Sequence, residues 1–412
     1  MLSKEQNELL CRIEPGTVMG DTLRQFWLPA IRSANLEVDG APERVRMLGQ
    51  NFVAFRDTTG RVGFLDEGCP HRGVSLALGR NEECGLRCIF HGWKINVDGQ
   101  VVEVPSEPAG SNLASKVRVN HYPAREEAGV VWVYLGKKEE APPFPAFDFV
   151  GRPLENMVPR KAIVNCNWVS LLEGLLDSSH VSSLHKDWLP TGQDVLSGPN
   201  AGVMGALSVT YEIEERPYGY QANARRKLAN GTEVNRKTEY ILPSFCMIPS
   251  TLKTLRGVSC IVPIDDEHTN FWTLSWDTAG PLDAATADRL RNVGKLGPDP
   301  DNIYFPRAGA DKVWNQDREA MKKGTSYAGY PALPIEDFAV SESQGIIVDR
   351  SAEKLGTSDI AIIRMRRLLF DLAKDYQEGR TPEVLSGNIE FGKIRPVHEV
   401  VAADGAPVEI KA

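Results

Sequence analysis

The 412-residue sequence predicts an α+β protein with an all-β N-terminal domain and a larger C-terminal domain whose antiparallel sheet is covered by helices. Two patterns predict this division. Short β-like runs, separated by turn residues, occupy residues 26–136. Longer β-like runs occupy residues 205–280, and few helices separate them, which favours antiparallel pairing.

Changes in composition set the boundaries of these parts. Residues 1–25 predict a helical segment that packs on the C-terminal domain. Residues 26–136 make the all-β domain. Residues 137–149 are charged and then rich in proline, which is typical of a linker. The C-terminal domain, and with it the larger sheet, then spans residues 150–412.

Local signals place single elements within these domains. Asp98 and Gly99 follow an alternating run and predict a β-hairpin. Residues 168–186 predict a helix, and a second helical region begins at Asp283. The last helix is indicated by apolar residues at helical spacing, namely Ile362, Met365, Leu369 and Leu372.

Composition excludes several classes of function. The net charge of −8 argues against nucleic acid as the main partner, because phosphate binding needs clustered Lys and Arg. No apolar run reaches the length of about 20 residues that a membrane helix needs. The N-terminus lacks the apolar core of a signal peptide, so we expect a cytoplasmic protein that binds no membrane. Seven cysteines in a chain of this length do not form a disulfide framework.

Cysteine and histidine coincide in one stretch, GCPHRGVSLALGRNEECGLRCIFHGW. Cys69 with His71, and Cys88 with His91, give each half one thiolate and one imidazole. These donors suit zinc or an iron–sulfur cluster. The spacing fits zinc poorly, because zinc pairs are usually C-x₂₋₄-C and H-x₃₋₅-H. It fits a 2Fe–2S cluster in which two histidines replace two cysteines on one iron.

The segments CPHRG and CIFHGW resemble the Rieske signature of the ring-hydroxylating oxygenases. This resemblance implies that Cys69 and Cys88 bind one iron while His71 and His91 bind the other. Cys84 lies between the two loops and is expected to be a loop residue. Cys84 would become a ligand only if the ligand positions of the motif fell on other residues of this stretch.

A second group of possible metal ligands lies in NCNWVSLLEGLLDSSHVSSLHKDW. On an ideal helix Glu173, Asp177 and His180 share one face, whereas His185 lies roughly 140° away from His180. Two imidazoles on one metal therefore require a π-type turn or a helix break between the histidines. The alternative is a pair of hydrogen-bonded core histidines.

The pattern E-x₃-D-x₂-H-x₄-H resembles the mononuclear iron motif of the same oxygenase family, and so implies that His180 and His185 bind Fe(II). A carboxylate completes the 2-His-1-carboxylate set. The late acidic segment PIEDFAVSESQG resembles the part of the family that supplies it. Among Glu336, Asp337 and Glu342 we choose Asp337.

Three further acidic residues, Asp349, Asp177 and Glu173, are expected to have roles other than that of the third iron ligand. Asp349 is the next candidate for the third ligand, although a cap or ion pair near Arg350 is the simpler interpretation. The resemblance makes Asp177 the bridge for electron transfer, accepting hydrogen bonds from His180 and from a cluster histidine of a neighbouring subunit. Glu173 either lines the same path or faces solvent.

The tail IEDFAVSESQGIIVDRSAEKLGTSDIAIIRMRRLL is similar to the phthalate dioxygenase group of this family. The resemblance implies a large, or alpha, subunit with a helix-grip-like catalytic domain, one Rieske 2Fe–2S cluster and one mononuclear Fe(II). It implies cis-dihydroxylation of a phthalate-, phenoxybenzoate- or chlorobenzoate-type substrate with O₂. The alternative is a Rieske monooxygenase that demethylates a methoxylated aromatic acid. A Rieske electron-transfer protein would need no second metal site.

The same resemblance implies partners. Members of the group are homo-oligomers, trimers or stacked trimers that form hexamers. Their electrons come from a separate reductase that carries FMN and a plant-type 2Fe–2S cluster and oxidises NAD(P)H. None of these partners follows from composition or spacing.

A substrate carboxylate in an apolar pocket needs a fixed cation, and arginine provides a two-pronged donor. Alternation in YGYQANARRK places Arg226 on the apolar face of its strand, so Arg226 is our preferred anchor. Gln221 stands where phthalate enzymes carry an arginine, which argues against phthalate itself. The other candidate arginines on predicted strands are Arg216, Arg225, Arg236 and Arg256.

Overall fold

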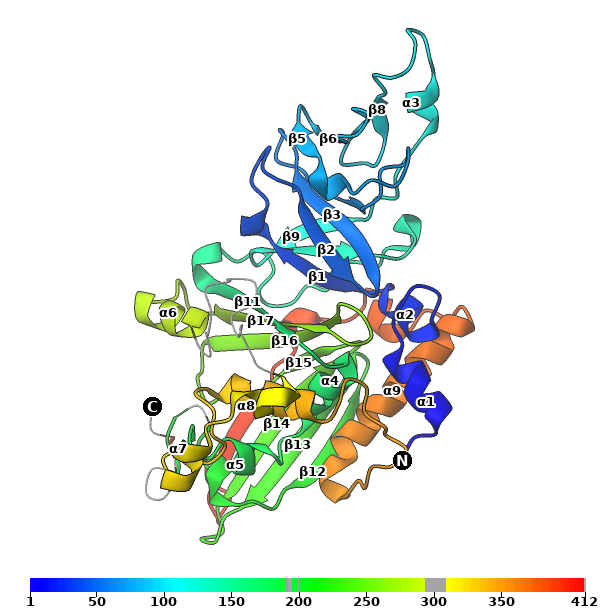
Figure 1. Ribbon diagram of the computed structural model, residues 1–412. Helices are drawn as coiled ribbons and strands as arrows, with labels where there is room; N and C mark the ends of the chain where they lie inside the picture. Colours follow the sequence, from blue (N-terminus) through cyan, green and yellow to red (C-terminus); the bar gives the residue numbers. More distant parts are fainter. Residues whose placement is uncertain (190, 192–194, 199, 293–308, 411–412) are drawn as a thin grey trace.

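A computed structural model describes residues 1–189, 191, 195–198, 200–292 and 309–410. It has the predicted α+β architecture, with an all-β N-terminal domain above a larger sheet flanked by helices (Figure 1). In the described ranges, no helix combines the length and the apolar character that crossing a membrane requires.

The N-terminal domain contains three small antiparallel sheets, in the orders β1-β10-β9, β2-β3-β4 and β5-β6-β7-β8. The predicted hairpin at Asp98 and Gly99 joins β7 to β8. Gly99 has a φ of +74°, which favours glycine. The elements are β1 (Trp27–Arg32), β2 (Glu43–Met47), β3 (Gln50–Arg56), β4 (Val62–Asp66), β5 (Arg80–Glu82), β6 (Gly85–Arg87), β7 (Lys94–Ile95), β8 (Val101–Glu103), α3 (Leu113–Lys116), β9 (Ala124–Glu127) and β10 (Val130–Tyr134).

The C-terminal domain is built on one antiparallel sheet in the order β11-β17-β16-β15-β14-β13-β12, with β18 also paired to β14. Helices α4 and α9 contact this sheet. Its strands are β11 (Met157–Val164), β12 (Thr210–Arg216), β13 (Gly219–Lys227), β14 (Glu233–Ile241), β15 (Phe245–Met247), β16 (Leu255–Pro263), β17 (Thr269–Asp277) and β18 (Val397–Val401). Its helices are α4 (Trp168–Leu176), α5 (Val181–Leu184), α6 (Ala284–Asn292), α7 (Arg318–Lys323), α8 (Leu333–Ser343) and α9 (Ile360–Gln377).

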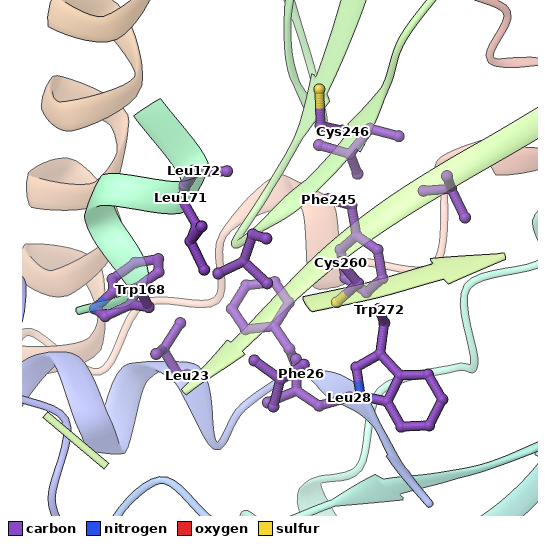
Figure 2. Packing of buried hydrophobic residues seen from close by; sticks show 14 of the residues in the cluster. Leu23, Phe26, Leu28, Trp168, Leu171, Leu172, Phe245, Cys246, Cys260 and Trp272 are labelled. Atoms are coloured by element: carbon purple, nitrogen blue, oxygen red, sulfur yellow. The ribbon is translucent and has the colours of Figure 1, made fainter. Parts of the chain in front are cut away.

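The N-terminal segment folds into α1 (Lys4–Cys11) and α2 (Val18–Leu23). Ser3 and Gln6 form a capping box at the start of α1. The segment contacts the C-terminal domain: Asn7 Nδ2 donates to the Val348 carbonyl at 2.9 Å, and α2 packs on α9. Figure 2 shows the apolar side of this contact, where Leu23 lies near Trp168 of α4.

Two apolar cores meet at the sheet β2-β3-β4. Because side chains alternate along a strand, Phe52 of β3 belongs to the main core, which extends through the sheet of the C-terminal domain. Val53 and Phe55 of the same strand belong to a smaller core that also contains Cys69 and Cys88. The N-terminal domain therefore has a tip, the loops and strands around this smaller core, and a base that shares the main core.

The segment 137–149 connects the two domains and is packed along part of its length. Phe147 and Phe149 are buried and stack at 5.4 Å between ring centroids. Phe149 also stacks on Trp132 of β10, and Phe147 lies 5.6 Å from the ring of Phe245 on β15. These aromatic contacts hold the two domains against each other.

Candidate metal centres

The two cysteine–histidine loops have the same backbone design. The Gly73 N–H donates to the Cys69 carbonyl at 2.8 Å, and the Gly92 N–H donates to the Cys88 carbonyl at 2.9 Å. Both glycines have a φ of +75°, a conformation that other residues rarely adopt. Each loop therefore turns back tightly on its cysteine, and the two turns are equivalent.

The four donor side chains of these loops form one group. Cys69 and Cys88 are 3% and 2% exposed, and both belong to the core of the tip. The His71 and His91 Nδ1 atoms lie 3.1 Å apart on the outer side of the same loops. The ring of His71 stacks on Trp93 at 4.8 Å and 3°. Two inner thiols and two outer imidazoles fit the donor set of a Rieske 2Fe–2S cluster.

Cys84 lies outside these loops. Its backbone N–H donates to Thr58 Oγ1 at 3.0 Å, and its φ is +63°. Its expected role as a loop residue rather than a ligand stays a prediction.

A second donor group lies in the C-terminal domain, where His180, His185 and Asp337 each place a ligand atom within 4.8 Å of the others. Asp337 Oδ1 is 3.5 Å from His180 Nε2 and 3.1 Å from His185 Nε2. Two imidazoles and one carboxylate converging from one side fit non-haem Fe(II), with open positions for small ligands.

The prediction of one continuous helix over 168–186 is wrong, because the chain leaves the helix between Leu176 and Val181. Helix α4 ends at Leu176, Asp177 is extended, and α5 begins at Val181, so the break precedes His180 instead of separating the two histidines. Asp177 Oδ1 accepts hydrogen bonds from both the N–H and the hydroxyl of Ser179, at 2.7 and 2.5 Å. This local turn competes with the helix and turns both imidazoles toward Asp337.

Each of the two imidazoles is also held by a second carboxylate. His180 Nδ1 lies 3.3 Å from Asp177 Oδ2, and His185 Nδ1 lies 2.6 Å from Glu336 Oε2. A carboxylate at Nδ1 fixes the N–H tautomer there, which leaves Nε2 with its lone pair directed at the metal position. Sequence reasoning considered Glu336 only as a possible ligand and missed this contact.

The electrostatics of the group favour a bound cation. Burial lowers the pKa of His180, but the carboxylates of Asp177 and Asp337 outweigh this effect and raise it to about 9. Burial raises the pKa of Asp337, but hydrogen bonds from both histidines hold it below its usual value. Positive charge is therefore stabilised between these side chains, and a metal ion can supply it in place of protons.

The other acidic candidates lie elsewhere. Glu342 accepts a hydrogen bond from the Asn165 N–H at 2.9 Å, and Asp349 caps the turn at Ser351. Glu173 does not face solvent, so that expectation is wrong; it lines the cavity beside the histidines, and its place on a path between subunits stays a prediction. Its carboxylate accepts from Arg350 at 2.9 Å and from Arg366 at 2.7 Å, two buried arginines that neutralise it.

A cavity of about 610 Å³ opens beside the histidines, within the size range of small-molecule sites. Its lining includes the three candidate ligands, Asp177 and the small residue Thr238. Its apolar lining residues include Val181, Leu184, Leu189, Ile248, Phe271 and Phe338.

Arg226, the preferred carboxylate anchor, is not among the residues that line this cavity. It is fully buried, as alternation predicts, but its guanidinium is engaged with the metal-binding segment. It donates to the Ser178 carbonyl and hydroxyl, and to the Ser182 hydroxyl at 3.2 Å. The geometry does not support its choice as the anchor, because these bonds occupy all three of its nitrogens.

Arg236 is the candidate arginine that lines the cavity. It lies opposite Ala224 in the β13–β14 register, and Ala222 lies opposite Thr238. These small neighbours leave room above the sheet. The other candidates are engaged or remote: Arg216 pairs with Glu214, Arg225 with Glu212 and Glu233, and Arg256 lines a separate pocket.

Comparison with known proteins agrees with both donor groups. Residues 26–123 match the family model of the Rieske [2Fe-2S] domain, and residues 133–401 match the model described as LigXa C-terminal domain like. The chain is 39% identical to the phthalate 4,5-dioxygenase oxygenase subunit of Pseudomonas putida, over 92% of this chain and 88% of that protein. It is 32% identical to the 3-chlorobenzoate-3,4-dioxygenase oxygenase subunit of Comamonas testosteroni, over 92% and 91%.

Solved structures share the fold at low sequence identity. Dicamba monooxygenase bound to dicamba superposes with a TM-score of 0.60 at 18% identity, covering 87% of this chain and 99% of that one. The chain therefore belongs to the Rieske non-haem iron oxygenases, enzymes with one Rieske 2Fe–2S cluster and one mononuclear iron. Within that family it groups with the phthalate and chlorobenzoate dioxygenase oxygenase subunits, as the motifs predicted.

Proposed function

We propose that this chain is the terminal oxygenase component of a multicomponent system and cis-dihydroxylates a small aromatic carboxylate with O₂. The observation that carries the proposal is Arg236. It is 4% exposed and lines the same cavity as the candidate iron ligands. Its Nη1 donates to Asn200 Oδ1 at 2.5 Å, and no carboxylate of the described residues forms an ion pair with it.

A buried arginine without an anion is an electrostatic cost that a bound anion removes. Burial lowers the pKa of Arg236 to about 10, so the guanidinium still carries its charge at neutral pH. Its Nε atom is buried without a hydrogen-bond partner. A substrate carboxylate would compensate this charge, and the apolar lining of the cavity suits an aromatic ring.

Charge and apolar lining together give the substrate an orientation. With its carboxylate at Arg236, the ring points across the cavity toward His180, His185 and Asp337. Phthalate, 3-chlorobenzoate and phenoxybenzoate occur in the names of enzymes similar to this chain, which supports this substrate class. When bound, the Rieske cluster supplies single electrons and the mononuclear iron activates O₂.

The roles of the site residues form part of the proposal. Cys69, His71, Cys88 and His91 hold the cluster, and His180, His185 and Asp337 hold the iron. Asp177 orients His180 through Nδ1. Its side chain is 20% exposed, so one edge of the carboxylate is available to another subunit.

We further propose a homo-oligomer, a trimer or a hexamer of stacked trimers. In one chain the tip with its cysteine–histidine loops lies at the opposite end of the molecule from α5 and α8 (Figure 1). Ile89 and Phe90, beside His91, are 58% and 52% exposed, which is unusual for large apolar side chains. A second copy that covers them would bring its Asp177 to the cluster histidines of the first.

The electrons would come from a separate reductase with FMN, a plant-type 2Fe–2S cluster and NAD(P)H as donor. O-demethylation of a methoxylated aromatic acid is the second candidate reaction. A 5,5'-dehydrodivanillate O-demethylase oxygenase subunit from Sphingobium sp. is 29% identical over 99% of this chain. Product analysis separates the two reactions, because one yields a cis-diol and the other a phenol with formaldehyde.

Binding of aromatic acids to Arg236→Gln tests the proposal. The dissociation constants of phthalate, 3-chlorobenzoate and 3-phenoxybenzoate are measured for the wild type and the variant, with their methyl esters in parallel. We expect the tightest acid to bind about 100-fold more weakly to the variant, because losing one partner of a buried charge pair costs about 2–5 kcal/mol. Binding of the ester should change little.

Arg216→Gln, which removes an arginine outside the cavity, is the matched control and should bind the acid as the wild type does. The Rieske absorption spectrum and the iron content of both variants verify folding. Equal affinity of wild type and Arg236→Gln for every acid that the wild type turns over would contradict the assigned anchor.

A further inference from the structure

We propose that Glu336 is a positioning residue that sets the iron affinity of the mononuclear site through His185. The inference rests on the proposed function, because it takes His180, His185 and Asp337 as iron ligands. Glu336 and Asp337 are consecutive residues of α8 and are therefore turned about 100° apart around the helix. Asp337 points at the metal position, and Glu336 reaches behind His185.

The contact between Glu336 and His185 is short and enclosed. Glu336 Oε2 lies 2.6 Å from His185 Nδ1, and both side chains are buried, at 0% and 3% exposure. In the neutral imidazole of His185, Nδ1–H donates to the carboxylate, so Nε2 keeps the lone pair that a metal needs. The buried carboxylate holds the ring in one orientation and makes Nε2 a stronger donor.

Charge in the site leads to the same assignment. Fe(II) with two neutral imidazoles and Asp337 leaves a net charge of +1 in a largely buried site. The carboxylates of Asp177 and Glu336 lie behind the two imidazoles, so each ligand histidine has a negative group on its outer side. The second oxygen of Glu336, Oε1, is buried and has no hydrogen-bond partner, and among the described residues no lysine or arginine forms an ion pair with Glu336. The carboxylate therefore has His185 and the metal behind it as its source of positive charge.

Asp177 and Glu336 differ in whether their carboxylates are accessible from outside the chain. Both place a carboxylate at the Nδ1 atom of a candidate ligand histidine. The Asp177 side chain is partly exposed, whereas that of Glu336 is completely buried. Glu336 can thus act only within its own chain, on the metal site alone.

A purely structural role predicts a different outcome. If Glu336 only tied α8 to the α5 segment, its replacement would weaken folding with or without metal. If it strengthens the bond between His185 and iron, its replacement should reduce the amount by which Fe(II) raises the Tm, because that rise depends on iron affinity. A purely structural role would instead lower the Tm equally with and without iron.

The test compares Glu336→Gln with Glu342→Gln. Glu342 is the matched control, since it is another buried glutamate of α8 and binds the Asn165 N–H instead of a candidate ligand. Mononuclear iron is removed by a chelator under anaerobic conditions while the Rieske spectrum verifies the cluster. The Fe(II) dissociation constant is then measured by chelator competition, and the Tm with and without Fe(II) by calorimetry.

We expect Glu336→Gln to bind Fe(II) 10- to 100-fold more weakly, the range found for partners of ligating histidines. The rise in Tm on adding Fe(II) should be smaller than in the wild type, and Glu342→Gln should keep wild-type affinity. Unchanged iron affinity in Glu336→Gln would overturn the inference, and so would an equal loss of affinity in both variants or a Tm lowered equally with and without iron. A wild-type protein that binds no Fe(II) at this site would instead overturn the proposed function.

Discussion

At the scale of single residues, the mononuclear site is defined by where the two imidazoles place their nitrogens. Asp177 and Glu336 occupy the Nδ1 sides of His180 and His185, so both Nε2 atoms face Asp337. An imidazole that is free to rotate would present either nitrogen. The carboxylates remove this ambiguity before a metal arrives.

Replacing Asp177 with asparagine should separate electron supply from product formation. The variant keeps the shape of the side chain but loses the charge that contacts His180 and, in the proposed oligomer, a cluster histidine of the neighbouring chain. With Fe(II) supplied in excess we expect normal iron content, normal reduction of the cluster by the reductase and almost no product. Asp349→Asn makes the same substitution at a turn far from the ligands and should retain activity. Full turnover by Asp177→Asn would refute the bridging role.

The raised pKa of His180 predicts that iron binding depends on pH. In the iron-free protein His180 keeps its proton up to a pKa of about 9, whereas iron binds only neutral imidazole. Apparent Fe(II) affinity should therefore rise between pH 6.5 and 8.5, by about tenfold per pH unit for each proton released. Anaerobic calorimetry in buffers of different ionisation enthalpy measures the release. Fewer than one proton released at pH 7.5 would contradict the raised pKa.

At the scale of elements, the segment between α4 and α5 decides the site. Its turn at Asp177 is local, but its position is fixed from outside by Arg226 of β13, which binds Ser178 and Ser182. The arginine that we expected at the substrate instead stabilises the backbone from which His180 projects.

Removing this support should loosen the iron site selectively. Arg226→Met keeps the length of the side chain but leaves the buried Ser178 and Ser182 oxygens without their donor, which costs about 1–3 kcal/mol for each unsatisfied group. We expect lower iron occupancy and a lower Tm, with an intact Rieske spectrum. Arg225→Met, one residue earlier and on the opposite face of β13, is the control. Equal iron occupancy in the two variants would show that Arg226 does not support the site.

The sequence predicted those elements whose signals are local. The helical repeat of Ile362, Met365, Leu369 and Leu372 matches α9, in which all four are buried. The turn residues of the β7–β8 hairpin also predicted it correctly. The hydrogen bonds of Arg226 to two serines and the burial of Glu173 between two arginines depend on residues 44 or more positions apart. The break after α4 begins at a local turn of Asp177 and Ser179, which competes with the helix without a clear sequence signal. Alternation shows that Arg226 and Arg236 share a buried face, but not which one meets the cavity.

At the scale of the whole molecule, the cysteine–histidine loops and the His180–His185–Asp337 group lie in different domains of one chain (Figure 1), and the proposed oligomer would bring unlike centres of two chains together. The exposed Ile89 and Phe90 beside His91 mark the surface where this would happen. The arrangement can be tested without a structure of the oligomer.

Mixed oligomers of two inactive variants should recover part of the activity. His71→Ala chains lack a complete cluster site, and His180→Ala chains lack a complete iron site. In a mixture, some interfaces pair an intact cluster with an intact iron on the neighbouring chain. We expect product from the mixture and none from either variant alone. Verified mixed oligomers without activity would refute the arrangement between subunits and leave the ligand assignments untouched.

The sheet β2-β3-β4 separates the two apolar cores, with Phe52 and Phe64 on one side and Val53, Phe55 and Leu65 on the other. Because the tip has an apolar core of its own, we expect it to open as a unit separate from the body. Its small core contains Cys69 and Cys88, the proposed cluster ligands, so we expect cluster binding to contribute directly to its stability. Loss of the cluster should increase amide hydrogen exchange in the tip while the catalytic body stays protected. An assembling cell can therefore complete the body first and insert the cluster afterwards.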